Sequence, residues 1–585
     1  MSPKKSRNEN KKERKKIFDW LPTKEQLRHL PKVLSKRERG LILTLIIVGI
    51  ASLITLPITS FRHYTTPTPD FGGSFTEGLV GTPQHINPLL TQTNDVDRDL
   101  SELIYSGLIK YNEQGELEPD LAESFSISDD GLTYTFKLRQ DLKWHDGQPI
   151  TADDVIFTVL VAQDVDRGSP QRRNWQGVDV SKTDGLTVKF VLKNKYAQFI
   201  SSTTMGILPK HIWENIAAGN FSLTEINLKP AVGSGPYKFS KIKRDSLGKI
   251  KVFEVVANED YYAGKPYISK INFNFYDSEE LMINAYNNNE IDSLGSVSPQ
   301  NLNSVRFLGQ LKINKLKLPR YFAIFFNQNQ SKVLSDKTVR TALSHSINKD
   351  KIIDDVLSGN GIRVDSPMLP GIINIPDNAV RYDFDTQKSE QILNEAGWNY
   401  SEENQVRVKG EDDSAVNLEI RLTTSNWPEL VSVANLVKEQ WEAAGARVRL
   451  ETLPLPELQQ VIKERTYEAL LFGEVLGLEP DPFSFWHSSQ KRDPGLNLAL
   501  YDNKDADRLL EEARQALNFT DRMAKYDELQ KLITQDIPAI FLYSPDYIYA
   551  RSANVKNGNG KVVSIPSDRF SMIHKWYIET KRVGK

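Results

Sequence analysis

The stretch EPDLAESFSISDDGLTYTFKLRQDLKWHDGQPITADDVIFTV, residues 118–159, contains the two periodicities that decide the fold. Apolar side chains recur at every second position from Leu132 to Leu138, which predicts a half-buried strand. His145, Asp146 and Gly147 then indicate a turn, and we interpret His145 and Asp146 as turn and cap residues rather than as a catalytic pair. Thr151, with a carboxylate three residues later, predicts the start of a helix. A strand followed so closely by a helix indicates an α/β protein.

The same patterns recur along the chain. Alternation at 186–192 and 271–275 predicts further strands, and apolar spacing predicts a helix from about 335 to 347. Between Val416 and Leu453 an alternating strand leads into a helix, which is expected to end at Gly445 before a second strand begins. This strand–helix–strand unit predicts a parallel or mixed sheet.

Length and composition exclude several classes of protein. With 585 residues the chain is too long for one ordinary core, so two or more structural units are expected. The 39% hydrophobic and 26% charged residues are typical of a globular protein. The absence of cysteine excludes disulfides, thiolate metal sites, cysteine nucleophiles and a lipidated cysteine anchor.

The N-terminal region predicts a membrane anchor. Residues 1–39 hold 14 Lys and Arg against 5 Asp and Glu, and residues 40–61 (GLILTLIIVGIASLITLPITSF) carry no charge. A helix of that length reaches roughly 33 Å, enough for a hydrocarbon core of about 30 Å. The basic head 1–39 is then cytoplasmic and the body extracytoplasmic, so a nucleic-acid role for the head is not expected. A cleaved signal sequence is the alternative, although the apolar run is longer than usual for one. The Thr/Pro-rich residues 62–73 are interpreted as a linker.

No catalytic or cofactor motif stands out. The sequence has no G-x-x-x-x-G-K-[ST], G-x-G-x-x-G, H-E-x-x-H or G-x-S-x-G, which removes the usual support for ATP-driven, dinucleotide, zincin and α/β-hydrolase functions. Eight histidines are scattered without close ligand spacing, so no metal site is predicted.

A series of motifs resembles a known family, the extracytoplasmic solute-binding proteins of peptide ABC importers, family 5, which include the dipeptide- and oligopeptide-binding proteins. The stretch at 118–159 matches the family signature almost throughout. The other motifs follow in family order: GTPQHINPLL (81–90), VGSGPYKF (232–239), NEDYYAGKPYISKINFNFY (258–276), NNNEIDSL (287–294), YFAIFFNQNQ (321–330), DKTVRTALSHSINKDKI (336–352) and EPDPFSFWHSSQ (479–490). The resemblance covers roughly residues 72–585.

The resemblance implies a two-lobed α/β fold of the periplasmic-binding-protein type, with mixed sheets. Its expected division is 74–318 for the first part of lobe I, 319–544 for lobe II and 545–585 for a return to lobe I. Two crossings near 318–321 and 543–546 would form a hinge, and the cleft between the lobes could close over a ligand.

The implied function is capture of peptides and their delivery to an ABC importer. The expected partners are a peptide ligand, the importer's permease subunits with separate ATPase subunits, and the membrane through residues 40–61. No enzymatic activity, cofactor or metal is expected. The alternatives are a tethered extracytoplasmic hydrolase, or a binder of the same fold whose ligand is a nickel complex, haem, an opine or a sugar.

Family position also nominates ligand-binding residues. They are Thr91, Gln92, Thr93, Asn94, Tyr321, Asn327, Asn426, Trp427, Glu474, Gly477, Leu478, Glu479, Asp481 and Trp486.

One nominated position departs from the family. Peptide-binding relatives carry an aspartate three residues before the acidic-Pro pair, where its carboxylate holds the ligand's α-ammonium group. Here that position is Leu478, which cannot pair a buried ammonium. Either Glu474 or Glu479 takes over the role, or the ligand's N-terminus is not held at this point. We therefore expect weakened selection for a free α-amino group.

Overall fold

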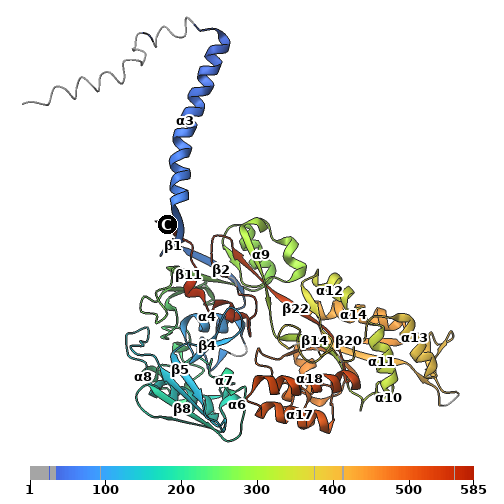
Figure 1. The fold of residues 1–585 in the computed structure, drawn as a ribbon. Coiled ribbons are helices and arrows are strands. Elements are labelled where there is room, and N and C mark those ends of the chain that lie inside the picture. The colour runs from blue at the N-terminus through green and yellow to red at the C-terminus, as the bar shows by residue number, and fades with distance from the viewer. Residues whose placement is uncertain are drawn as a thin grey trace, which may run out of the picture. The chain divides into compact units, whose positions relative to one another are not determined.

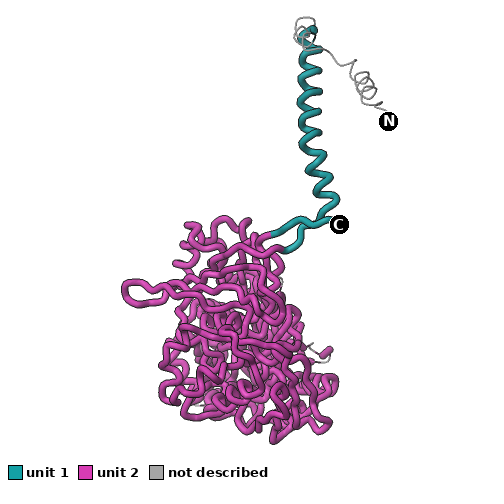
Figure 2. The backbone as a smooth tube through the Cα atoms, turned by 90° about the vertical axis from the view of Figure 1, so that its left-hand side faces the viewer, with its two compact units in different colours: residues 1–69, 580–585 teal, residues 70–579 magenta. Residues whose placement is uncertain are grey.

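The computed structural model describes residues 26, 34–91, 94–373, 376–377, 379–411, 414–558 and 560–585. The chain divides into two compact units, coloured in Figure 2. One contains residues 1–69 and 580–585, and the other contains residues 70–579, which we call the body.

The smaller unit is built on the helix α3 (Lys36–Tyr64). Ser35 and Glu38 form a capping box at its start, and none of its side chains is buried. The helix is long and apolar enough to cross a membrane, with a mean hydropathy of 2.7 in its most apolar window. The apolar run predicted at 40–61 lies inside it.

The segment predicted as a linker differs from the expectation in one respect. Residues Thr65–Pro69 form a strand, β1, which pairs antiparallel with β23 (Thr580–Gly584), so that Thr65 lies opposite Gly584. The end of the chain, expected to belong to lobe I, therefore groups with the smaller unit. Local composition could not indicate this ladder, because the two strands lie at opposite ends of the sequence.

A long mixed sheet runs through the body in the order β20-β19-β21-β14-β22-β12-β2-β11-β10-β9, with β13 and β15 also paired to β22. Its strands are β2 (Ser74–Val80), β9 (Tyr237–Arg244), β10 (Ile250–Ala257), β11 (Lys270–Tyr276), β12 (Ser293–Leu294), β13 (Leu311–Lys317), β14 (Arg320–Phe326), β15 (Gly361–Arg363), β19 (Glu419–Ser425), β20 (Arg447–Leu453), β21 (Ala469–Val475) and β22 (Ala539–Ser552). There are three smaller sheets among the described residues of the body. One pairs β3 (Ile109–Tyr111) with β4 (Leu117–Pro119), and another has the strand order β5 (Ala122–Ile127), β6 (Thr133–Leu138), β8 (Thr187–Leu192), β7 (Val178–Lys182). The third contains β16 (Asn399–Ser401), β17 (Val406–Lys409) and β18 (Val416–Asn417).

Buried apolar residues divide the body into two lobes. The cores that define the first lobe use residues between Phe75 and Leu318 and again between Tyr549 and Trp576. The two cores of the second lobe use residues between Tyr321 and Tyr543. Strand β22 serves both lobes, because its start pairs with β14 and its end pairs with β13 (Figure 1). The exact lobe boundaries stay a prediction, which this division of the cores supports.

Helices cover the sheets in both lobes. The first lobe contains α4 (Asp95–Ile104), α5 (Ala152–Gln163), α6 (Arg172–Trp175), α7 (Phe199–Ser202), α8 (Lys210–Trp213) and α9 (Glu279–Asn287). The second contains α10 (Lys332–Ser335), α11 (Lys337–His345), α12 (Lys349–Leu357), α13 (Thr386–Glu395), α14 (Pro428–Ala443), α15 (Leu455–Glu464), α16 (Phe483–Trp486), α17 (Lys504–Gln515) and α18 (Phe519–Asp536).

The strand–helix–strand unit predicted at 416–453 is confirmed. Strands β19 and β20 lie parallel with α14 between them, and Gly445 adopts a left-handed φ of 93° just after the helix ends. The predicted helix start at Thr151 is also confirmed, with a capping box to Asp154.

A buried charge cluster ties the C-terminal return to the first lobe. Arg569, in a short 3₁₀ helix (Pro566–Phe570), forms two 2.6 Å bonds to the carboxylate of Asp99 and one of 3.0 Å to Glu77. The hydroxyl of Tyr549 donates to the other oxygen of Glu77 at 2.7 Å. The three charged side chains are at most 5% exposed, so the guanidinium and the two carboxyl groups are largely shielded from bulk solvent.

Candidate ligand-binding site

A cavity of about 370 Å³ lies at the edge of the second lobe where several strands end. Strands β19, β20 and β21 run parallel, so their carboxyl ends meet at one edge of the sheet, the usual place for a ligand in such sheets. The cavity is lined by Arg320, Tyr321, Phe322, Ser425, Asn426, Trp427, Leu430, Leu455, Phe472, Gly473, Glu474 and Val475. Of these, Tyr321, Asn426, Trp427 and Glu474 were nominated from the sequence. We call this the strand-end cavity.

One edge of β21 faces this cavity without a strand partner. Strand β19 pairs with β21 only at Ala469 and Leu470, although β21 continues to Val475. Its other edge pairs with β14 over the full length. Among the described residues, the main chain of 472–475 therefore has no ladder partner on the β19 side. Such an edge can accept an added strand.

Glu474 is the buried acid of the strand-end cavity. It is 3% exposed, and its Oε2 accepts a hydrogen bond from the hydroxyl of Tyr321, which is fully buried. Its Oε1 has no hydrogen-bond partner among the described residues. Burial raises the pKa of Glu474 well above its usual range, which favours the neutral carboxyl, the form that can donate a hydrogen bond through Oε1.

The cation in the wall of this cavity, Arg320, also interacts with a charge of the first lobe. Burial lowers the pKa of Arg320, while the charges of Glu429 and Asp95 oppose that shift. Asp95 opens helix α4 of the first lobe. The strand-end cavity therefore lies within electrostatic reach of the N-terminus of α4.

The two lobes also touch at a second place. The side chain of Gln198, in the first lobe, donates to Tyr526 Oη at 2.9 Å and to the carbonyl of Pro480 at 3.3 Å. Close by, the Tyr196 hydroxyl donates to Asp481 at 3.2 Å. These hydrogen bonds connect the first lobe to segment 480–481 and to Tyr526 of the second lobe.

Comparison with known proteins shows to which protein family the chain belongs. The family model of bacterial extracellular solute-binding proteins, family 5 (middle), matches residues 116–496, which is more than half of the chain. The chain belongs to family 5. It is 28% identical over 521 residues to the oligopeptide-binding protein AppA of Bacillus subtilis, spanning 87% of this chain and 92% of that protein.

Solved structures agree with this family 5 membership. The structure of AppA from Bacillus subtilis in complex with a nonapeptide has a TM-score of 0.68 and 27% identity, covering 88% of this chain and all of that one. NikZ from Campylobacter jejuni in complex with Ni(L-His) has a TM-score of 0.70 and 26% identity, covering 86% of this chain and 99% of that one. The two-lobed fold predicted from the sequence is confirmed.

Other residues nominated from family 5 positions lie elsewhere. Asn94 caps α4, since its side chain accepts from Val96 N–H and donates to the Thr82 carbonyl, both at 3.0 Å. Asn327 follows the far end of β14, roughly 20 Å along the strand from Tyr321, and its amide donates to the Arg465 carbonyl.

Two nominated side chains are held by the second lobe itself. Trp486 is fully buried against Phe325 and Phe541. Asp481 receives bonds of 2.9 and 2.5 Å from the guanidinium of Arg514.

The last nominated residues border the first lobe or fall outside the description. Leu478 lies against Gly115 of the first lobe, beside Gly477, which has a left-handed φ of 79°. Glu479 faces Arg522 at 3.4 Å. Thr91 lines a different cavity, described below, and Gln92 and Thr93 lie outside the described residues. Sequence reasoning missed Arg320, Phe322, Ser425 and Phe472, because no local pattern distinguishes a strand-end residue that lines a cavity from one that does not.

Proposed function

We propose that this family 5 protein is a membrane-anchored, extracytoplasmic receptor that captures peptides between its lobes and delivers them to an ABC importer. The observation that carries the proposal is the unpaired edge of β21 beside the strand-end cavity. A peptide added as a strand at residues 472–475 would gain main-chain hydrogen bonds that tolerate many side chains. The nonapeptide complex of AppA supports peptide as the ligand class.

The importer's other subunits are expected to be separate chains. The sequence has no phosphate-binding loop for ATP. The permease would receive peptide from the closed body, in which both lobes contribute to one surface.

Ligand recovery tests the proposal. The full chain would be purified in detergent, and the molecules released on denaturation would be identified by mass spectrometry, with metal content measured in parallel. We expect intact peptides. A stoichiometric nickel complex, or products of hydrolysis in place of intact peptides, would contradict the proposal.

The anchor makes a separate prediction. Because α3 supplies a fully apolar span, the protein should stay in the membrane fraction during washes with high salt and alkaline carbonate. Release by either wash, or a mature N-terminus that begins beyond Thr59, would show that α3 is not an anchor.

The third prediction concerns the ligand's N-terminus. Glu479 faces Arg522, Asp481 is held by Arg514, and burial disfavours the charged form of Glu474, so the carboxyl groups along 474–481 are poorly suited to hold an α-ammonium group. We therefore expect N-acetylation of a bound peptide to change its dissociation constant by less than about tenfold, or 1.4 kcal/mol.

Calorimetric titration of one peptide with and without the acetyl group measures this change. If acetylation weakens binding a hundredfold or more, about 2.7 kcal/mol, an ammonium site exists. Glu474→Gln and Glu479→Gln would then identify its carboxylate.

A further inference from the structure

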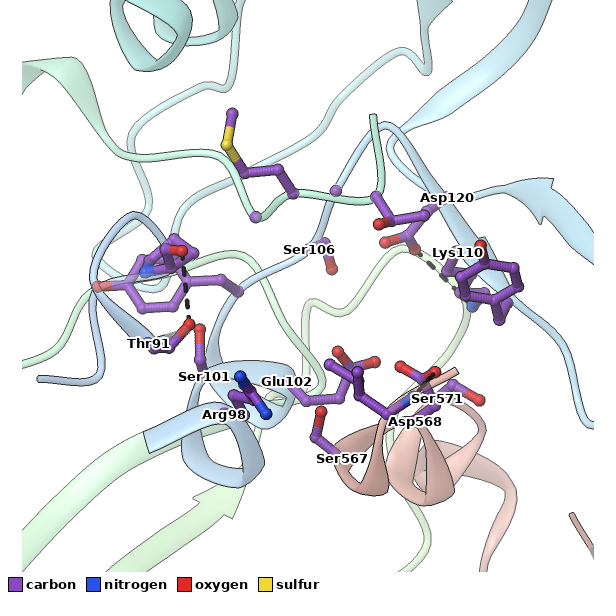
Figure 3. Close-up of a pocket in the computed structure, with 18 of the residues that line it drawn as sticks. Thr91, Arg98, Ser101, Glu102, Ser106, Lys110, Asp120, Ser567, Asp568 and Ser571 are labelled. Atoms are coloured by element: carbon purple, nitrogen blue, oxygen red, sulfur yellow. Dashed lines mark hydrogen bonds and ion pairs between the residues drawn. The ribbon is translucent and has the colours of Figure 1, made fainter. Parts of the chain in front are cut away.

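A second cavity, of about 150 Å³, lies inside the first lobe (Figure 3). Its walls come from α4, from β3, from residues 204–206 and from the C-terminal return at 565–571. An apolar cavity of about 150 Å³ is known to accept a benzene molecule, so this volume suits one side chain rather than a length of peptide. We call it the α4 cavity.

The charges of the α4 cavity do not balance. Its two cations already have carboxylate partners, because Arg98 pairs with Asp95 at 2.8 Å and Lys110 lies 3.7 Å from Asp120. Two further carboxyl groups, Glu102 and Asp568, have no cation within ion-pair distance among the described residues. Figure 3 shows Glu102 pointing into the cavity from α4, with Asp568 on the neighbouring 3₁₀ helix.

The pKa values of these two groups reflect that imbalance. Burial raises the pKa of Glu102 well above its usual range, and the nearby Asp568 and Asp120 raise it further while Lys110 opposes them. Burial also raises the pKa of Asp568 to about 6, although two backbone N–H groups and the charge of Arg98 oppose the shift. The cavity is thus poorly suited to two negative charges by themselves, and a cation placed between them would stabilise both.

Hydroxyl groups with unused hydrogen-bonding capacity line the same space. Ser567 is 1% exposed and Tyr105 is 5% exposed, yet the side chain of neither makes a hydrogen bond to a described residue. In Figure 3 Ser567 lies beside Glu102 at the floor of the cavity. Hydroxyl groups without a protein partner on a cavity wall are available to hydrogen-bond to a polar ligand.

The ligand is unlike a bare metal ion. Within the described part of the chain, no three His, Asp or Glu side chains come close enough to hold one. The carboxyl groups are spread around the cavity, an arrangement that fits a group with several N–H donors.

The α4 cavity also lies near residues 478–479, which follow the edge of β21 at which the peptide is proposed to lie. Tyr111, in its wall, is close enough to Glu479 for that charge to raise the tyrosine pKa. Gly115, four residues further along the chain, lies against Leu478. A side chain leaving a peptide near Leu478 would therefore face the first lobe at this cavity.

We propose that the α4 cavity receives a lysine or arginine side chain of the bound peptide, held by Glu102 and Asp568. The proposal rests on the proposed function and narrows it, because it makes this receptor selective for peptides with a cationic side chain at one position. The bound ammonium or guanidinium would donate charge-assisted hydrogen bonds to both carboxylates.

Two peptide series test the selectivity. Full-length protein in detergent micelles would be titrated at pH 7.5 with alanine pentapeptides that carry one lysine at each position in turn, and with the same series carrying methionine. At one position we expect lysine to bind at least about tenfold more tightly than methionine, or 1.4 kcal/mol. Glu102→Gln should reduce this preference below about threefold while leaving the affinity for the methionine peptide unchanged.

Controls separate the outcomes. Glu123→Gln removes a half-exposed carboxylate elsewhere in the first lobe and should keep the lysine preference. The preference should also shrink at pH 5.5, because Asp568, whose pKa burial raises to about 6, is then largely protonated and attracts a cation less strongly. If peptides bind but lysine has no advantage at any position, or if Glu102→Gln leaves the advantage intact, the α4 cavity proposal is overturned and the proposed function stands. If neither series binds, the proposed function fails and this proposal with it.

Discussion

Replacing Arg569 with methionine is expected to lower the free energy of unfolding by about 3–5 kcal/mol. The guanidinium is the only described cation within ion-pair distance of Glu77 and Asp99, and all three side chains are excluded from water. Methionine keeps much of the volume and removes the charge. Two carboxyl groups would then remain buried without a cation.

The pH dependence of that loss identifies its cause. Burial already raises the pKa of Glu77 and Asp99 in the folded chain, and removal of Arg569 raises both further. A raised folded-state pKa means that the folded variant holds protons which the unfolded chain releases above about pH 4, so stability is lost as the pH rises. The deficit should therefore be larger at pH 8 than at pH 5.

Urea unfolding of the full chain in detergent, followed by tryptophan fluorescence, measures this deficit. Arg508→Met is the matched control, because that arginine pairs with Glu512 on an exposed face of α17 and should matter little. An Arg569→Met variant as stable as Arg508→Met at pH 8 would contradict the role given to the cluster.

Replacing Trp427 with alanine is expected to weaken peptide binding by about thirtyfold, or 2 kcal/mol, the cost typical of an aromatic residue at the centre of an interface. Trp427 is 46% exposed and packs edge-on against Phe322 at a ring distance of 6.2 Å. Together they form the aromatic wall of the strand-end cavity. A peptide at the edge of β21 would cover the exposed face of the indole.

Calorimetry with the recovered peptide measures the change in affinity, and thermal unfolding shows whether the fold is intact. Tyr400→Ala provides the control, since that ring is 49% exposed and lies on β16, outside the cavity. Equal affinities for the two variants would exclude the strand-end cavity from the binding site.

Local patterns predicted the elements but not their long-range partners. Thr151 and Asp154 are three residues apart, so the sequence alone revealed their helix start, and the alternation and helical spacing of 416–453 revealed a parallel strand pair. The pairing of Thr65 with Gly584 depends on the whole intervening fold and has no local signal.

The residues of the candidate site could likewise be predicted from the sequence only in part. The family motifs led to Tyr321, Trp427 and Glu474, which the fold brings together in one cavity. They led to Thr91 in the wall of the α4 cavity but not to its acids, because Glu102 and Asp568 come from opposite ends of the body and each alone resembles an ordinary surface carboxylate. Burial, which distinguishes these two groups, is a property of the tertiary structure.

The ribbon of β1 and β23 has a mechanical consequence. If a single flexible linker joined the body to the helix, rotation about individual backbone bonds of that linker could turn the body freely. Here the chain enters the body after Pro69 and leaves it again at Thr580, so two covalent connections lead back to the helix unit, and they are joined by a ladder of hydrogen bonds. Two connections leave fewer backbone bonds free to rotate than one linker would, so the membrane-anchored receptor proposed above would lose less rotational entropy each time it docked onto a transporter in the same membrane.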